Sequence, residues 1–471
     1  MVDKKELWKG FLFVLSSKVA IIALGIAQIT IIPRILNPVN MGIYSYWLSV
    51  LLIFSAILDL GGPEILSRYL PELRLRDQNS VKSLFKKNIQ VKIFFLPFLI
   101  LAGLCLFKNE RVFFIMILVA SIFVSLSNLI QAGFYGFKDF SRYSMIQTSR
   151  ILIRLIFVII LFSLLGNIGI ICALLGGAIL TTLVFYPRIK KLVPPYYGEL
   201  HRPFIKYFSY GLYLYPGSML GILNTWLAVI LVKNFIPDFR VVGFLGLAIQ
   251  ICLFAITGIL ASVYETIFPT LVEFHTNNQS QLREIFELNW KYTNIILMPA
   301  VIGFYFLANP TISFFIGTEY LPTAEIIKYL LPSVIFFTWG GIYQQIILIF
   351  EKKKEYLFTQ LARFFSFLIL TIILINNIGV LGAPIAISFG TFISFIFSYF
   401  YANKLLKIKS FLIHVFKPTL ASLSACVMVN MLKIDNIYIL LSSIVLGGLI
   451  YLFVMVIIKG IIKDDINSLK L

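Results

Sequence analysis

The sequence has little charge, few cysteines and few histidines. Charged residues make up 13% of its 471 residues, whereas 59% are hydrophobic. This composition leaves too little polar surface to cover a soluble protein of this length. The four cysteines and three histidines are scattered without close spacing, so neither a disulfide framework nor a metal site is indicated.

Common catalytic signatures are missing as well. The chain contains no G-x-x-x-x-G-K-[ST] loop, no H-E-x-x-H and no G-x-S-x-G. Nucleotide hydrolysis and the commoner forms of peptide or ester chemistry therefore have no local support, and an ATPase that drove this protein would be a separate chain. We expect a protein that is not an enzyme and that binds no cofactor.

Long apolar segments are what the sequence does contain. Most are near the ~20 residues needed to cross a bilayer. About fourteen can be delimited, at residues 9–34, 41–64, 89–107, 112–137, 145–165, 167–187, 207–233, 239–264, 288–307, 326–350, 355–375, 378–401, 413–432 and 436–459. The sequence therefore predicts an all-α polytopic membrane protein. The first segment is too long for a signal-peptide core and lacks a small-residue cleavage site, so we expect no cleaved leader.

The basic residues fall mainly in every second gap between these segments. The other gaps and their flanks keep only Arg34, Lys108, Arg111, Lys233, Arg240, Lys328 and Lys433. By the positive-inside rule, this alternation predicts that both termini are cytoplasmic. Orientation and anionic lipid headgroups also account for the net charge of +19, so we do not expect nucleic acid as a partner.

Short segments recur in the same order along the chain, which indicates an internal repeat. The matching pairs are 34–44 with 233–244, 69–73 with 267–271, and 167–169 with 377–379. Each half would contain six spans, so the two halves would be parallel copies. We therefore expect two parallel six-helix bundles around a central cavity, with two additional C-terminal helices. The expected divisions are 1–200, 201–408 and 409–471.

Several segments resemble a known family. Residues 33–44 (PRILNPVNMGIY), 59–62 (DLGG) and 67–73 (SRYLPEL) resemble the opening of bacterial polysaccharide flippases of the multidrug/oligosaccharidyl-lipid/polysaccharide exporter superfamily. Residues 314–324 (FFIGTEYLPTA) resemble the segment that begins the tenth span in those proteins. The likeness extends over the whole chain, including the number of spans and the parallel halves.

The resemblance implies a Wzx-type flippase. Such a protein moves an undecaprenyl-pyrophosphate-linked oligosaccharide from the inner to the outer leaflet of the bacterial cytoplasmic (inner) membrane, for O-antigen, lipopolysaccharide, capsule or a related surface polysaccharide. Membrane lipids, a polysaccharide polymerase and a chain-length regulator are then candidate partners. The transport cycle could be coupled to a proton or sodium gradient.

Basic residues inside apolar spans are the candidate substrate-binding groups, because intramembrane charges usually face an aqueous cavity. They are Lys18, Arg150, Arg154 and Arg363. Gln147 shares one helical face with Arg150 and Arg154. Counted from the two Asn-Ile-Gly segments, Arg154 and Arg363 fall within one position of each other in the two halves, and two guanidinium groups suit a pyrophosphate. The alternative is that these side chains reach the cytoplasmic headgroups and have no role in transport.

Acidic and neutral polar residues inside the spans form two further groups of candidates. Asp59, Glu64 and Glu265, near the inner span ends, either form gate ion pairs with basic residues such as Arg68 or bind a coupling ion. Amides and aromatic rings could line the glycan path, or they could hold helices together and anchor them at the interfaces. This group consists of Gln28, Gln131, Gln147, Asn224, Trp226, Gln250, Trp339, Tyr343 and Gln344.

Other functions remain open at this point. A peptidoglycan-precursor lipid flippase would carry a similar substrate and differs little in sequence. A cation-coupled multidrug antiporter of the same superfamily is disfavoured by the excess of basic over acidic intramembrane groups and by the extra pair of spans. A membrane glycan polymerase is less favoured, because the outer gaps are short and their carboxylates are far apart in the sequence.

Overall fold

The structure is a computed structural model, and it describes residues 4–76, 78–195, 198, 200, 203–252, 271, 279–406, 413–432 and 434–460. These ranges form helices, turns and short connections, with no strand. The chain divides into two compact units, Met1–Gly246 and Leu247–Leu471. The expected all-α fold is confirmed. The expected boundaries at residues 200 and 408 separate the repeated groups of six spans, and they stay a prediction.

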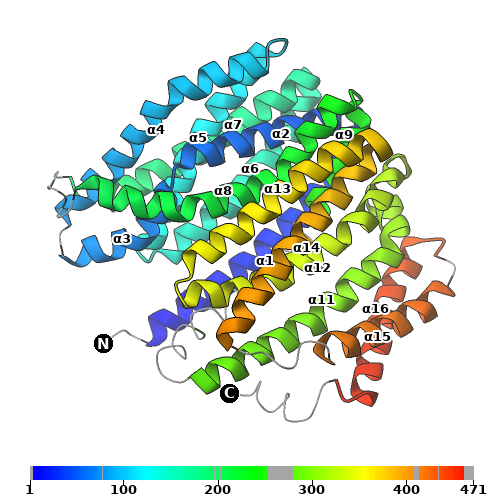
Figure 1. Ribbon diagram of the computed structural model, residues 1–471. Coiled ribbons are helices and arrows are strands. Elements are labelled where there is room, and N and C mark those ends of the chain that lie inside the picture. Colours follow the sequence, from blue (N-terminus) through cyan, green and yellow to red (C-terminus); the bar gives the residue numbers. More distant parts are fainter. Residues whose placement is uncertain are drawn as a thin grey trace. The chain divides into compact units, whose positions relative to one another are not determined.

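The first unit is built from α1 to α8 and the beginning of α9 (Figure 1). Within it, α7 packs against both α5 and α6, α1 packs against α6, and α8 packs against α2 and α3. The helices are α1 (Lys4–Ile35), α2 (Pro38–Asp59), α3 (Gly62–Arg76), α4 (Asn79–Leu106), α5 (Arg111–Gly136), α6 (Phe140–Leu165), α7 (Asn167–Lys190), α8 (Phe204–Phe235) and α9 (Phe239–Ile251).

The second unit repeats the packing of α5, α6 and α7 in α12, α13 and α14, and it ends in two further helices, α15 and α16. In it, α14 packs against α12 and α13, and α11 packs against α12, α15 and α16. Aromatic side chains of α11, α12 and α14 fill much of the core, including Trp290, Tyr343 and Phe395. The helices are α11 (Gln279–Phe315), α12 (Leu321–Ile349), α13 (Lys353–Ile378), α14 (Gly382–Leu406), α15 (Ile413–Asn430) and α16 (Ile437–Ile457), with 3₁₀ turns at Thr318–Tyr320 and Gly379–Leu381.

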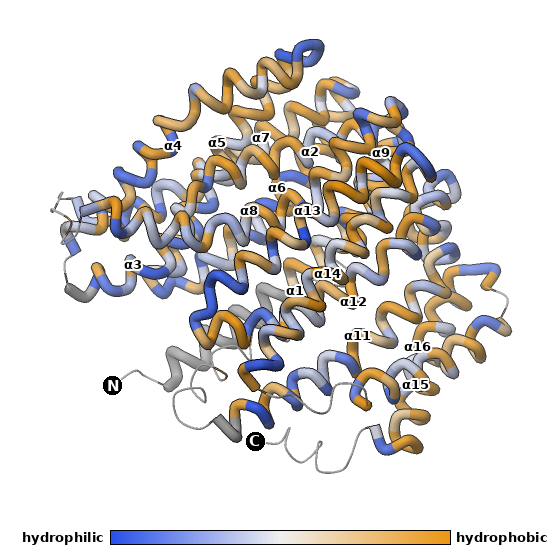
Figure 2. Tube along the Cα trace, in the orientation of Figure 1, coloured by the Kyte–Doolittle hydropathy of each residue, from blue (hydrophilic) through white to orange (hydrophobic). Residues whose placement is uncertain are grey.

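Most helices are long and apolar enough to cross a membrane. Ten such stretches occur among the residues that the structure describes, and the longest, Lys353–Leu406, contains both α13 and α14. Hydrophilic residues gather at helix ends and connections, while the helix bodies are mainly hydrophobic (Figure 2). The chain is therefore a multi-pass membrane protein, as the sequence predicts.

One predicted span is interrupted. The segment 41–64 was expected as a single helix, but α2 ends at Asp59 and α3 begins at Gly62. Leu60 and Gly61 both have positive φ angles, 47° and 76°. A break inside a membrane leaves backbone carbonyls without helical partners, so other groups must satisfy them. Here Lys92 Nζ donates to Leu58 O at 2.9 Å, and Tyr215 Oη donates to Ile57 O at 3.0 Å.

The two units repeat a helical hairpin with a constant spacing of 213 residues. The turn between α5 and α6 places Lys138 at φ 60°, and the turn between α12 and α13 places Glu351 at φ 55°. Lys138 N donates to Tyr135 O at 2.9 Å, and Glu351 N donates to Leu348 O at 3.0 Å. Because positive φ is uncommon outside glycine, the shared conformation supports the internal repeat.

The next connection fixes the register of this repeat. Gly166 ends α6 at φ 59°, and Gly379 ends α13 at φ 66°. This pairing shifts the register by three residues from the one that the Asn-Ile-Gly segments suggest. Counterparts are therefore Arg150 and Arg363, and not Arg154 and Arg363. The match of the Asn-Ile-Gly segments is misleading because the shared conformation belongs to Gly166, which precedes the first segment, and to Gly379, which ends the second.

The beginnings of α2 and α9 cross at two glycines of the first unit. A Cβ on Gly42 would lie 1.8 Å from Phe239 O, and a Cβ on Gly243 would lie 2.4 Å from Pro38 O. The sequence match of 34–44 with 233–244 aligns Gly42 with Gly243, so the contact is reciprocal. Only glycine permits backbones to approach this closely.

Candidate functional site

Two arginines lie on adjacent turns of α6 in the first unit. Arg150 Nη2 donates to Ser127 Oγ of α5 at 2.7 Å. Arg154 Nη2 donates to Gln28 Oε1 of α1 at 2.9 Å. The Nε atoms of both arginines are buried and have no hydrogen-bond partner. Neutral oxygens thus hold each guanidinium group in place and leave part of its donor capacity unused.

Among the described residues, neither of these two guanidinium groups forms an ion pair with a carboxylate. Within the described residues, the ion pairs of this unit involve other cations, namely Arg68, Lys92 and Arg142. Two like charges four residues apart on a helix repel each other, and burial makes both charges costly. An anion with more than one negative charge would relieve both penalties, so we define Arg150 and Arg154 as the first-unit arginine pair.

The second unit carries a related but simpler arrangement on α13. A Tyr-x-x-x-Gln-x-x-Arg pattern ends at Arg150 in α6 and at Arg363 in α13. Arg363 is 7% exposed, and its guanidinium carbon lies 5.0 Å from the ring centroid of Phe337. The sequence reading missed this pattern because it compared the halves in a different register. The repeated spacing of Tyr, Gln and Arg was the signal that could have revealed it.

Amide and hydroxyl groups lie near the same helix. Gln360, in the turn before Arg363, donates through Nε2 to Gln344 Oε1 at 3.1 Å. Gln344 Nε2 in turn lies 3.3 Å from the hydroxyls of Ser394 and Ser398 on α14. This chain of neutral polar groups has no net charge and joins α12, α13 and α14.

A separate buried ion pair stabilises the break between α2 and α3. Lys92 Nζ lies 3.4 Å from Asp59 Oδ1, and the two side chains are 8% and 16% exposed. Lys92 also donates to Ser125 Oγ at 2.5 Å, while Ser125 and Asn128 donate to the two Asp59 oxygens at 2.7 and 2.9 Å. Lys92 lies inside the predicted span 89–107, and this position is the sequence signal of an intramembrane charge.

The other charged candidates are dispersed. Glu64 accepts a hydrogen bond from Ser218 Oγ at 2.9 Å, and its other oxygen is buried without a partner. Arg68 approaches Glu72 at 4.0 Å on its own helix, and its guanidinium group lies over the Tyr69 ring. Lys18 belongs to α1, but its side chain lies outside the described residues, as does the whole of Glu265.

The candidate glycan-path residues occupy several environments. Trp339 donates through Nε1 to Asn294 Oδ1 at 2.8 Å and packs against the aromatic core of the second unit. Asn224 donates to Leu220 O of its own helix at 2.8 Å. The remaining candidates divide into the buried Gln28, Trp226, Gln250 and Tyr343 and the partly exposed Gln131, Gln147 and Gln344. Gln28 is thus positioned to orient Arg154, and a role for the others in a glycan path stays a prediction.

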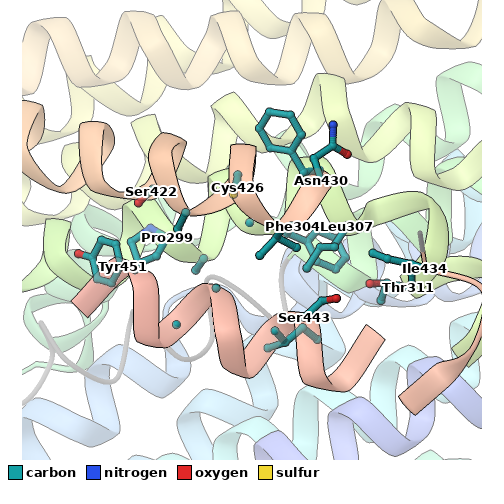
Figure 3. A pocket seen from close by; sticks show the side chains of 18 residues that line it. Pro299, Phe304, Leu307, Thr311, Ser422, Cys426, Asn430, Ile434, Ser443 and Tyr451 are labelled. Carbon is teal, nitrogen blue, oxygen red and sulfur yellow. The ribbon is translucent and has the colours of Figure 1, made fainter. Parts of the chain in front are cut away.

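The second unit also contains an apolar pocket of about 400 Å³ between α11, α15 and α16 (Figure 3). Pro299, Phe304 and Leu307 of α11 face Cys426 and Tyr451 of the C-terminal helices across it. No charged side chain lines this pocket. Its chemistry therefore suits a hydrocarbon chain and not a phosphate or sugar headgroup.

A family model described as "Polysaccharide biosynthesis protein" matches residues 7–275 of the chain. Among curated proteins, "Uncharacterized membrane protein MJ1068" of Methanocaldococcus jannaschii is 27% identical over 248 residues, which cover 50% of this chain and 47% of that protein. The chain thus matches about half the length of this relative.

Solved structures of membrane transporters share the fold. The lipid II flippase MurJ in an inward closed conformation has a TM-score of 0.71 and 19% identity, with 95% of this chain and 98% of MurJ covered. An inward-facing multidrug resistance MATE family transporter of the MOP superfamily has a TM-score of 0.61 and 15% identity, covering 84% and 98%. A MOP superfamily transporter from Pyrococcus furiosus has a TM-score of 0.57 and 13% identity, covering 84% and 95%. At these identities the likeness concerns the fold alone.

Proposed function

The chain belongs to the polysaccharide biosynthesis protein family, and from this membership we propose that it is a flippase for a lipid-linked oligosaccharide. Its substrate would be an undecaprenyl-pyrophosphate-linked repeat unit of O-antigen, capsule or a related surface polysaccharide. The protein would move this headgroup across the bacterial cytoplasmic membrane by alternating access, with both of its own termini in the cytoplasm. No bond is made or broken in such a cycle, so the proposal requires no catalytic residue.

The observation that carries this proposal is the first-unit arginine pair. Arg150 and Arg154 are anchored by Ser127 and Gln28 and lack a carboxylate among the described residues. Removing one partner of a buried ion pair typically costs about 3–5 kcal/mol, which indicates how unfavourable an uncompensated buried charge is. A pyrophosphate offers several anionic oxygens to the planar guanidinium forks and would relieve this cost during transport.

The rest of the substrate needs different surroundings. Moving a polyprenyl tail from hydrocarbon into water would cost free energy. The tail can therefore stay in the bilayer or enter the apolar pocket of the second unit. Sugar hydroxyls need hydrogen-bond partners once they leave water, and the Gln344–Gln360 chain is one candidate source. The polymerase and chain-length regulator proposed as partners would act on the substrate after it reaches the outer leaflet.

A multidrug antiporter is the rival of a different class. Organic cations require exposed or transiently released carboxylates, yet Asp59 is already neutralised by Lys92 in this structure. The MurJ structure also matches 95% of the chain, against 84% for the MATE structure. A peptidoglycan-precursor flippase uses the same pyrophosphate-sugar chemistry, so the lipid-linked units of a deletion strain must distinguish it from the proposed function.

The first test is to delete the gene and to analyse lipid-linked glycans together with surface polysaccharide. We expect completed undecaprenyl-pyrophosphate oligosaccharides to accumulate while surface polymer disappears. Accumulation of the peptidoglycan precursor would instead support the lipid II alternative. Unchanged levels of the lipid-linked glycans and of the surface polysaccharide would contradict a flippase function.

The second test complements the deletion with Arg150→Gln and Arg154→Gln variants. Each should lower the amount of surface polysaccharide by about tenfold or more at normal protein level, because hydrogen bonds to charged groups contribute ~1.5–3 kcal/mol. Arg188→Gln is the matched control, since Arg188 is an exposed guanidinium over the Phe185 ring at the end of α7. Full complementation by the α6 variants would remove the arginine pair from the mechanism.

A further inference from the structure

The apolar pocket of the second unit lies beside a proline in the middle of α11. Pro299 has no backbone N–H, so the helical hydrogen bond to Ile295 O cannot form. Tyr451 Oη of α16 donates to this oxygen at 2.7 Å. The carbonyl that the proline leaves free is therefore satisfied by a neighbouring helix, and α16 is held against α11 at this point.

Glycines leave space in two walls of the pocket. Gly303 of α11 and Gly448 of α16 both line it, and a Cβ at either position would meet no atom within 4 Å. Ile444, in the same wall as Gly448, is 47% exposed, so the pocket opens toward a surface that faces the bilayer. Close packing leaves few voids larger than a water molecule inside proteins. A pocket of about 400 Å³ in this place therefore needs an occupant.

One end of the pocket is polar. Ser443 lines the pocket and is completely buried, and its Oγ has no hydrogen-bond partner among the described residues. It lies toward the end that carries Thr311 and Asn430, whereas Pro299 and Tyr451 lie at the other end (Figure 3). A buried hydroxyl without a partner is unfavourable. The occupant is therefore expected to offer a hydrogen-bond acceptor at this end and hydrocarbon elsewhere.

This polar end lies near one surface of the membrane. Ser443 belongs to the first two turns of α16, Asn430 is the last residue of α15, and Thr311 belongs to the last two turns of α11. The hydrocarbon core of a bilayer is about 30 Å thick, and the headgroup regions begin at its edges. The polar end of the pocket is thus close to the depth at which lipid chains join their headgroups.

The polar end suits an ester better than a phosphate. In a glycerophospholipid, each acyl chain begins at a neutral ester carbonyl, and the charged phosphate lies farther out. In a polyprenyl lipid, the hydrocarbon ends directly at a charged phosphate. No cation lines the pocket among the described residues, and a buried charge without a partner is costly. The Ser443 hydroxyl, in contrast, can donate to a neutral carbonyl oxygen.

We propose that this pocket binds an acyl chain of a membrane glycerophospholipid, and that Ser443 Oγ donates to the ester carbonyl of that chain. The bound lipid fills the space beside Gly303 and Gly448 and joins the two C-terminal helices to α11. This inference goes beyond the proposed function, because the lipid stays with the protein and is not transported. The polyprenyl tail of a transported substrate then remains in the bilayer.

Competition between lipids, followed by native mass spectrometry, tests the identity of the occupant. The purified full-length protein in detergent micelles is incubated with equal amounts of dioleoyl phosphatidylglycerol, its ether-linked dioleyl analogue and undecaprenyl phosphate. The ether lipid differs from the ester lipid only in lacking the carbonyl oxygens. We expect the wild-type protein to retain the ester lipid about fivefold more than the ether lipid, which corresponds to one hydrogen bond.

Substitutions assign the retained lipid to the pocket. Gly303→Leu fills the pocket from α11 and should abolish retention of the ester lipid, while any undecaprenyl phosphate bound elsewhere stays. Ser443→Ala should retain the ester and ether lipids equally. Gly221→Leu is the matched control, because a Cβ on Gly221 of α8 also meets no atom within 4 Å and this residue lies outside the pocket. Melting temperatures show which variants are folded, and Gly448→Leu fills the pocket from α16 if Gly303→Leu does not fold.

Three outcomes would overturn the inference. The first is a wild-type protein that retains the ester and ether lipids equally. The second is full retention of the ester lipid by the folded pocket-filling variants, because the lipid would then bind elsewhere. The third is loss of undecaprenyl phosphate from those variants in place of the ester lipid, because the pocket would then hold a polyprenyl tail. None of these outcomes contradicts the flippase proposal, which the gene deletion tests separately.

Discussion

At the scale of single residues, the first unit contains buried or partly buried cations in two different situations. Lys92 is surrounded by oxygens of Leu58, Asp59 and Ser125, one of which carries a full negative charge. Among the described residues, Arg150 and Arg154 donate hydrogen bonds only to a neutral hydroxyl and a neutral amide oxygen. A paired charge contributes to the folded structure, whereas an unpaired charge is available to a ligand. The two situations lead to opposite expectations for mutants.

Removing Lys92 should destabilise the protein. A Lys92→Met variant leaves the Asp59 carboxylate buried without its cation, which costs about 3–5 kcal/mol. The double variant Lys92→Met with Asp59→Asn removes both charges and should recover most of that loss. Unfolding in mixed detergent micelles, followed by circular dichroism, measures the difference. Equal instability of the single and double variants would show that the ion pair is not the source.

Changing Gln28 to Glu should disable the arginine pair without harming the fold. The new carboxylate would lie about where Gln28 Oε1 now accepts from Arg154 at 2.9 Å. An internal anion would then compete with the ligand for the guanidinium group. We expect binding of farnesyl pyrophosphate to weaken by about tenfold or more, because ion-paired hydrogen bonds are the stronger class. Gln131→Glu, on α5, is the comparison, and an equal loss there would point to general electrostatics.

The arginines of the candidate site could be chosen from the sequence as charged residues inside apolar spans. Arg150, Arg154 and Arg363 follow from the cost of intramembrane charge, and each of them is at least partly buried. Their partners could not be derived, because Gln28 and Ser127 are distant in the sequence from the arginines that they contact. The same holds for Asp59, whose cation comes from α4 and not from the neighbouring Arg68.

At the scale of helices, the crossing of α2 and α9 should depend on its two glycines. Gly42→Ala introduces a methyl group at 1.8 Å from Phe239 O, so the helices must separate. Overpacking of this kind costs about 1–3 kcal/mol and would shift the protein away from this conformation. Ser45, buried below the crossing, can be replaced by cysteine as a reporter. We expect Gly42→Ala to increase the rate of maleimide labelling of that cysteine by about tenfold.

Gly221→Ala provides the control for this experiment. Gly221 lies on α8, and a Cβ there would have no atom within 4 Å. The labelling rate should therefore stay at the level of the parent protein. If Gly42→Ala also leaves the rate unchanged, the crossing does not restrict access to Ser45.

Apolar periodicity and span length predicted most helices, but not the interruption between α2 and α3. The Asp59-Leu60-Gly61-Gly62-Pro63 segment carries a local turn signal, a pair of glycines followed by proline, but the length of the apolar segment 41–64 favoured one continuous span. The structure allows the break because Lys92 and Tyr215 reach the freed carbonyls from α4 and α8. Such long-range compensation has no local signature.

At the scale of the whole molecule, the distribution of basic residues predicts which loops face the cytoplasm. Single cysteines at Asn109 and Lys353 can test this in a variant whose four natural cysteines have been replaced by serine. An impermeant maleimide should label the cysteine at position 109 in intact cells, and the cysteine at 353 only after permeabilisation. The opposite pattern would invert the proposed orientation of the chain.

Composition sufficed to predict an all-helical membrane protein, because so few polar residues permit no other class. The repeat was visible in short segments, but the Asn-Ile-Gly segments gave a register three residues away from the one that the backbone conformation and the Tyr-x-x-x-Gln-x-x-Arg pattern share. Gly166 and Gly379 share positive φ angles, but their neighbours, Asn167 and Val380, differ. The substrate depends on side chains that differ between the copies, and symmetry cannot predict those.

The constant spacing between the two hairpins indicates how the gene evolved. Turns as unusual as those at Lys138 and Glu351, together with the helix ends at Gly166 and Gly379, indicate that an ancestral gene was duplicated and fused. A protein assembled from identical half-length chains must carry every substitution twice. Fusion removed that constraint, and the two copies now differ at equivalent positions, with Arg154 in the first and Phe367 in the second.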